Sequence, residues 1–232
     1  MSKTRLLPPA LSAGMRQTMP IVLGYLPVGF AYGVLALKTG LSPLNTVLMS
    51  VLVFAGSAQL IAVGLLAAGA APLSIAATTF VVNLRHVLMA ASLAPHLKSW
   101  SRSRLAWFGF QLTDETFALH SLRFIRGEAD PAETFAVNAV AQGAWVAGTL
   151  LGVAAGGVVA DVRPLGLDYA LPAMFIALVV GQVRDRVHVL VGLVSAALAL
   201  VLFAVGMQQW NVIVATLCGA GLGTGVAVWT RR

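Results

Sequence analysis

Long apolar runs alternate with short polar connections along the chain, and the runs show no regular alternation of apolar and polar residues. A helix that crosses a bilayer needs roughly 20 mostly apolar residues, whereas a strand of a membrane barrel would alternate over roughly ten. The pattern therefore predicts an all-α polytopic membrane helix bundle of about eight segments, with room for broken or re-entrant ones. The approximate bounds are Met19–Leu37, Leu44–Ala68, Pro72–Ala94, Leu105–Ile125, Phe135–Val159, Tyr169–Val183, Val187–Met207 and Val212–Trp229.

The connections between these segments are short and carry residues that favour turns, as at Lys38–Gly40 and Gly127–Pro131. None is long enough to separate two domains, so residues 1–232 form a single predicted transmembrane domain. Residues 1–17 lack the uninterrupted apolar stretch of a cleavable signal peptide. We therefore expect the first helix to be an uncleaved insertion signal.

Hydrophobic residues make up 59% of the 232 residues and charged residues only 10%, with a mean hydropathy of +0.88. Soluble domains contain roughly 45–50% apolar and about 25% charged residues, so the surplus apolar surface must face lipid. The formal net charge of +7 comes from basic residues in the connections, where they indicate topology and headgroup contacts. No basic stripe with interleaved aromatics exists, which excludes nucleic acid. A single cysteine, Cys218, and no Cys/His cluster argue against a metal site.

The distribution of basic residues conflicts with eight simple spans. Lys and Arg concentrate in cytoplasmic loops, and the basic N-terminus argues that the chain begins in the cytoplasm. Arg123 and Arg126 then fall inside as expected, but Lys98, Arg102 and Arg104 fall outside. The conflict disappears if the third and fourth segments are broken or re-entrant, because irregular backbone is tolerated at membrane depth where it lines a cavity.

Three ionisable residues, Arg85, Asp114 and Glu115, fall near the middle of apolar segments. Each costs at least about 2.5–3.5 kcal/mol at the bilayer centre, so Arg85 is expected to pair with Asp114 or Glu115. One interpretation is a polar pocket in which Arg85 or exposed N–H groups bind a substrate carboxylate. Asp114 or Glu115 would then bind an ammonium or carry a coupling proton. The alternative is an ion pair that only joins two helices.

Other polar residues extend this candidate site. Asn83 and His86 share a helix face, and Gln111 shares a face with the acidic pair. His86 could shuttle protons or simply pack. Lone amides such as Gln59, Asn138 and Gln142 more often join helices than bind ligands. The predicted substrate-binding or coupling residues are Asn83, Arg85, His86, Gln111, Thr113, Asp114, Glu115 and Gln59. No catalytic residue, metal ligand or cofactor is expected.

Four motifs in order resemble the AzlC family: Pro20–Gly33, Phe54–Gln59, Asn83–His86 and Thr113–Leu119. The resemblance covers about the first two-thirds of the chain. It implies the large subunit of a secondary exporter for branched-chain amino acids (leucine, isoleucine, valine) and in some members methionine. It also implies a small AzlD-type membrane partner and a place in the bacterial cytoplasmic (inner) membrane. The absence of a GxxxxGK[ST] loop is consistent with transport without ATP hydrolysis.

Three other functions compete with that expectation. One is a channel or carrier for another small solute, such as an azole or organic anion. Another is an intramembrane hydrolase with Ser57 and His86 as a dyad, although no full nucleophile motif is present. The last is a membrane scaffold without transport activity.

Overall fold

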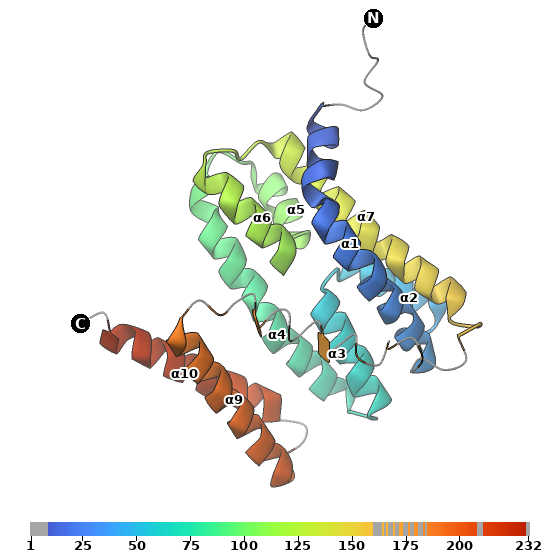
Figure 1. Ribbon diagram of the computed structural model, residues 1–232, viewed down its shortest axis with the longest axis vertical. Coiled ribbons are helices and arrows are strands. Elements are labelled where there is room, and N and C mark those ends of the chain that lie inside the picture. Colours follow the sequence, from blue (N-terminus) through green and yellow to red (C-terminus); the bar gives the residue numbers. More distant parts are fainter. Residues whose placement is uncertain are drawn as a thin grey trace, which may run out of the picture.

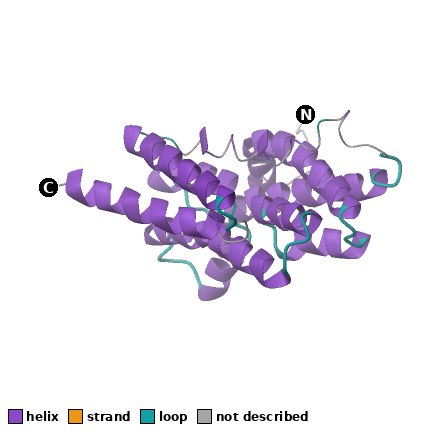
Figure 2. Ribbon diagram, turned by 90° about the horizontal axis from the view of Figure 1, so that it is seen from below, coloured by secondary structure: helices purple, strands orange, loops and turns teal. Residues whose placement is uncertain are grey.

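The computed structural model describes residues 9–159, 185–207 and 211–230, together with isolated positions between 160 and 184. These residues form helices and no strand, which confirms the all-α prediction (Figures 1 and 2). The predicted segment Tyr169–Val183 falls mostly outside the described residues. The helices are α1 (Pro9–Lys38), α2 (Pro43–Leu52), α3 (Gly56–Ala67), α4 (Pro72–Leu93), the short 3-10 helix η1 (Ala94–His96), α5 (Arg102–Phe110), α6 (Asp114–Ile125), α7 (Pro131–Ala155), α9 (Arg186–Ala204) and α10 (Asn211–Thr230).

Four described helical stretches are long and apolar enough to cross a membrane: Gly14–Lys38, Pro72–His96, Pro131–Ala155 and Arg186–Ala204. Large apolar side chains such as Leu23, Phe80 and Leu88 are exposed on their outer faces. In α9 no residue is buried. Since a water-soluble protein rarely exposes apolar surface on this scale, these faces fit contact with lipid.

Helices α2 and α3 replace the second expected span with two half-length pieces. They contain 10 and 12 residues, too few to cross roughly 30 Å of hydrocarbon. Near its start, α2 accepts a hydrogen bond at Thr46 from Tyr32, and at its end Val51 accepts one from Gln142 in the middle of α7. From there α3 starts beside the middle of α4 and returns to the end where α4 begins. The pair is therefore a re-entrant hairpin.

Helices α5 and α6 form a second re-entrant hairpin from the opposite end of the bundle. Phe108 of α5 and Phe124 of α6 pack with Leu93 at the end of α4. The turn between the two helices reaches the middle, where Thr113 meets Tyr25 of α1. The predicted break in the fourth segment is thus confirmed. The predicted break in the third segment is wrong, because α4 is continuous from Pro72 to Leu93. The second segment is broken in its place.

The two hairpins remove the conflict among the basic residues. Lys98, Arg102 and Arg104 lie in the connection and helix that follow the end of α4. That end also holds the start of α1, the end of α6 and the start of α7, with Arg16, Arg123 and Arg126. A chain that enters and leaves the bilayer on the same side keeps all these cations together. Lys38, at the other end of α1, lies on the opposite side.

Helices α1 and α7 pack side by side through small residues on both helices (Figure 1). A methyl group at Gly33 would lie 2.5 Å from the Thr149 carbonyl oxygen, and one at Gly148 would lie 2.5 Å from the Leu26 carbonyl oxygen. A methyl group at Gly29 or Gly152 would likewise clash with a backbone carbonyl oxygen of the other helix. Spacings of four residues on each helix give the small-residue interface that lets membrane helices approach closely.

Helices α9 and α10 form a hairpin of their own, drawn in orange and red beside α4 in Figure 1. Ser195 of α9 packs on Gly219 of α10. The polar residues singled out from the sequence all lie in the other part of the bundle, α1 to α7. The candidate site is therefore a feature of that part.

Candidate functional site

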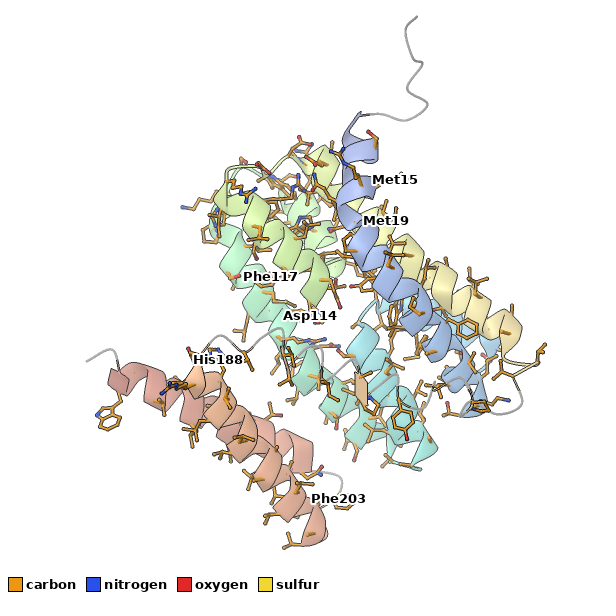
Figure 3. All side chains as sticks on the ribbon, viewed as in Figure 1. Met15, Met19, Asp114, Phe117, His188 and Phe203 are labelled. Carbon is orange, nitrogen blue, oxygen red and sulfur yellow. The ribbon has the colours of Figure 1, made fainter. Side chains whose placement is uncertain are left out.

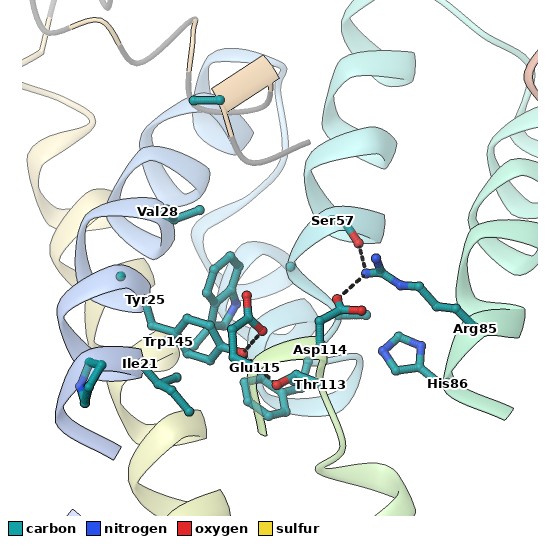
Figure 4. A pocket seen from close by; sticks show the side chains of 16 residues that line it. Ile21, Tyr25, Val28, Ser57, Arg85, His86, Thr113, Asp114, Glu115 and Trp145 are labelled. Atoms are coloured by element: carbon teal, nitrogen blue, oxygen red, sulfur yellow. Dashed lines mark hydrogen bonds and ion pairs between the residues drawn. The ribbon is translucent and has the colours of Figure 1, made fainter. Parts of the chain in front are cut away.

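A cavity of about 360 Å³ lies where α1, α3, α4, α6 and α7 meet (Figure 4). Its size is within the range typical of small-molecule sites. The apolar part of the wall includes Ile21, Val28, Phe54 and Trp145. The polar part comprises Tyr25, Ser57, Arg85, His86, Thr113, Asp114 and Glu115.

The start of α6 brings two carboxylates to this cavity. Thr113 caps the helix, and its side chain exchanges hydrogen bonds with Thr116 in a capping box. Asp114 and Glu115 occupy the first turn, next to the positive end of the helix dipole. Asp114 marks the inner end of α6 in Figure 3. The local sequence therefore explains both the helix start and the location of the acidic pair.

The start of α3 faces the same cavity from the other hairpin. Phe54 turns the chain with φ of 44°, a left-handed conformation that is strained for a bulky residue. Its buried ring packs edge-on against Tyr25, with centroids 6.3 Å apart. The capping residue, Ala55, provides no side-chain hydrogen bond, so the first N–H groups of α3 lack a side-chain cap. Two helix N-termini thus meet at the cavity, as in transporters that bind anionic groups at interrupted helices.

Arg85 connects the two helix starts. Its Nη2 atom lies 2.9 Å from Asp114 Oδ2 and also donates to the Ser57 hydroxyl. The side chains of Arg85 and Asp114 are 24% and 21% exposed, so the pair is largely shielded from solvent. The predicted pairing of Arg85 with a carboxylate across two helices is confirmed, and its partner is Asp114.

Glu115 faces the opposite wall, as expected for neighbours about 100° apart on a helix. Its Oε2 atom accepts a 2.6 Å hydrogen bond from the Tyr25 hydroxyl, which also lies 2.7 Å from Thr113 Oγ1. Among the described residues, no basic side chain comes within 4.0 Å of this carboxylate. Both carboxylates line one cavity, but only Asp114 has a counter-charge.

His86 lines the cavity next to Arg85, and its Nδ1 lies 3.2 Å from the Asn83 carbonyl oxygen. Because a carbonyl only accepts, Nδ1 is the donor in this contact, and in the neutral ring Nε2 is then an acceptor. Asn83 itself does not line the cavity, and its side-chain oxygen is buried with no hydrogen-bond partner among the described residues. No hydrogen bond joins the described side chains of Ser57 and His86, as a catalytic dyad would require.

Gln59 and Gln111 lie behind the wall rather than on it. Gln59 is fully buried, donates to Ser50 at 3.0 Å and accepts from the Trp145 indole at 3.1 Å. Gln111 donates to Gln142, which in turn donates to the Val51 carbonyl. Each amide therefore ties a helix break to α7. They hold the cavity wall in place and do not face its interior.

Sequence reasoning assigned no site role to several residues that line the cavity, Tyr25 and Trp145 among them, and it considered Ser57 only as a nucleophile. Tyr25 and Trp145 pack edge-on with centroids 5.5 Å apart. The signal for Tyr25 was available, because a phenol needs a polar partner inside an apolar helix. Trp145 gave no such signal, since a tryptophan in an apolar run is equally compatible with a packing role and with a place in a binding site.

A second polar cluster lies further along α6. His120 donates from Nε2 to Asn138 Oδ1 at 2.8 Å, and both side chains are fully buried. Arg123 pairs with Glu133 at 2.7 Å. The cluster joins α6 to α7 near the end that carries most of the described basic residues, and it lines no part of the cavity.

The helices, their apolar outer faces and the polar cavity at two helix breaks define an all-α integral membrane protein. Comparison with known proteins gives its family: the family described as "AzlC protein" matches residues 20–159. The chain belongs to the AzlC family.

Relatives of similar length match most of the chain. The Escherichia coli "Inner membrane protein YgaZ" is 30% identical over 89% of this chain and 86% of its own length. An Archaeoglobus fulgidus "Uncharacterized membrane protein" is 32% identical over 89% and 90%. The Bacillus subtilis "Branched-chain amino acid transport protein AzlC" is 28% identical over 84% and 77%. No solved structure matches.

Proposed function

We propose that this protein is the large subunit of a secondary transporter that exports branched-chain amino acids across the bacterial cytoplasmic membrane. The observation that carries the proposal is the cavity at the meeting point of two re-entrant hairpins, with Arg85, Asp114 and Glu115 in its wall. Family membership and the name of the Bacillus subtilis relative support branched-chain amino acids as the substrate class.

The cavity matches the chemistry of such a substrate. The uncapped first turn of α3 and the Arg85 guanidinium offer donors for a carboxylate. Glu115 offers an acceptor for an ammonium group. Ile21, Val28, Phe54 and Trp145 offer apolar surface for a branched side chain. In this arrangement the substrate carboxylate lies toward α3 and α4, and its ammonium lies toward α1.

The charge distribution supports an orientation. The end of the bundle with Arg16, Lys98, Arg102, Arg104, Arg123 and Arg126 faces the cytoplasm, since cytoplasmic loops carry the excess of basic residues. The α5–α6 hairpin then enters from the cytoplasm and the α2–α3 hairpin from outside. Alternating access would open the cavity first past one hairpin and then past the other.

The test is uptake and exchange of leucine, isoleucine, valine and methionine in proteoliposomes, with and without a small AzlD-type membrane subunit. Saturable exchange that requires both subunits is the expected result. Absence of exchange for all four under imposed proton and sodium gradients, with both proteins folded, would contradict the substrate assignment. It would favour the second candidate, a channel or carrier for another small solute such as an azole or organic anion, for which non-saturable flux would indicate a channel.

A further inference from the structure

The charges in the cavity wall do not balance. Arg85 contributes one positive charge, and Asp114 cancels it through the 2.9 Å ion pair. Glu115 adds a second carboxylate whose described polar partner is the neutral Tyr25 hydroxyl. With both carboxylates ionised and the His86 ring neutral, the described wall therefore holds one uncompensated negative charge.

An uncompensated charge at membrane depth is costly, so a cation must neutralise it. A zwitterionic amino acid carries no net charge, but its ammonium group can neutralise Glu115 while its carboxylate binds elsewhere in the cavity. In the empty cavity the simplest neutralising cation is a proton. The same carboxylate oxygens therefore serve either the proton or the ammonium.

We propose that Glu115 exchanges one proton for the ammonium group of each substrate, which makes the carrier a proton–amino acid antiporter. This inference rests on the proposed function. On binding, the protonated Glu115 carboxyl releases its proton to water, and the carboxylate left behind accepts hydrogen bonds from the substrate ammonium. On release to the outside, a proton replaces the ammonium. An inward proton gradient then drives the substrate outward.

The described cavity wall holds four other titratable side chains around Glu115. Tyr25 approaches from α1, Arg85 and His86 from α4, and Asp114 is its neighbour on α6. Asp114 is held by Arg85, and Tyr25 is the donor to Glu115. His86 donates its Nδ1 proton to the Asn83 carbonyl, and among the described contacts it forms no hydrogen bond or ion pair with either carboxylate. Glu115 is thus the group whose charge the substrate must balance.

The test counts protons released when leucine binds to the purified transporter with its small subunit. Titration calorimetry in buffers of different ionisation enthalpy gives the count at each pH. We expect the wild type to release about one proton for each leucine bound at the acidic end of the pH series. There its apparent Kd should rise about tenfold for each pH unit of acidification. Glu115→Gln should release none, and its Kd should no longer depend on pH.

Three further measurements make the result decisive. Glu128→Gln is a matched control, the same change on an exposed loop residue, and should behave like the wild type. Leucine binding by the wild type without proton release at any pH would overturn the antiport proposal alone. Absence of leucine binding by the folded wild type would instead overturn the proposed function. If Glu115→Gln still released one proton and His86→Gln released none, the exchange would be assigned to His86. That result would overturn the role of Glu115.

Discussion

On one side of the cavity, α1 and α7 pack backbone against backbone, whereas on the other side α3, α4 and α6 are joined by polar side chains. Gly33 and Gly148 leave no room for a methyl group between the first two helices. Across the cavity, Arg85 connects Ser57 and Asp114 through a hydrogen bond and an ion pair. Close backbone packing therefore holds the first wall together, and interactions between polar and charged side chains hold the second.

The two kinds of contact differ in what a substrate can do to them. Close backbone packing changes little when a small polar molecule enters, because side-chain interactions do not hold it together. An ion pair can exchange one partner for a substrate carboxylate or ammonium. We therefore infer that α1 and α7 form the fixed frame and that the hairpin of α3 or α6 moves during transport.

The largest effect is expected from Gly148→Ala. The new Cβ would lie 2.5 Å from the Leu26 carbonyl oxygen, and backbone atoms cannot move aside as a side chain can. Separating α1 from α7 should cost about 3 kcal/mol or more and leave little folded protein. Fluorescence-detected size exclusion and thermal melting in detergent would measure the loss.

Gly143→Ala, in the same helix, provides the matched control. A Cβ there would meet nothing within 4 Å, and alanine favours helix. Its melting temperature should equal or exceed that of the wild type. Equal stability of the two variants would show that the α1–α7 contact is not the rigid frame inferred here.

The wall formed by α3, α4 and α6, called the charged wall below, should respond differently to substitution. Arg85→Gln leaves Asp114 without its partner and should destabilise the protein by about 3 kcal/mol. Asp114→Asn leaves the guanidinium with two acceptors, the Ser57 hydroxyl and the new amide oxygen, so it should reduce leucine flux without loss of folded protein. The double variant should recover much of the stability lost in Arg85→Gln but not the flux. Thermal melting and proteoliposome flux would be measured together, and wild-type flux in a well-expressed Asp114→Asn variant would refute its role.

This wall was largely predictable from the sequence, because charge in an apolar run is costly wherever it lies. Arg85 and Asp114 could therefore be expected to pair without knowledge of their helices. The break after Gln111 was also predictable, since polar residues and a capping threonine interrupt the run there.

The break at Phe54 was not predictable from the same logic. Residues 53–55 are apolar, and the chain turns through a left-handed phenylalanine whose ring is fixed by tertiary packing against Tyr25. Conversely, the polar stretch around Arg85 suggested a break that α4 does not have, because side chains from α3 and α6 satisfy the guanidinium within a regular helix. Polarity in the sequence indicates where partners are needed, but it does not indicate which helix bends to provide them.

Tyr25 spans the two walls, and its hydroxyl is the contact of the rigid frame with Glu115. Tyr25→Phe keeps the ring packing and removes the donor to the carboxylate. A hydrogen bond to a charged group contributes about 1.5 kcal/mol, so leucine should bind roughly tenfold more weakly. Titration calorimetry would measure the affinity, and melting temperature should change little. Unchanged affinity would mean that the substrate ammonium does not use Glu115.

Ser57→Ala should have the smallest effect on transport. The hydroxyl accepts one of the hydrogen bonds of Arg85, and Asp114 still holds the guanidinium without it. Hydrogen bonds between membrane helices contribute about 0.6 kcal/mol on average, so flux should fall less than about threefold. A hydrolase would behave in the opposite way, because loss of its nucleophile abolishes activity. Complete loss of function in Ser57→Ala, with Arg85→Gln still active, would therefore contradict the transporter proposal. It would support an enzyme in which Ser57 is the nucleophile.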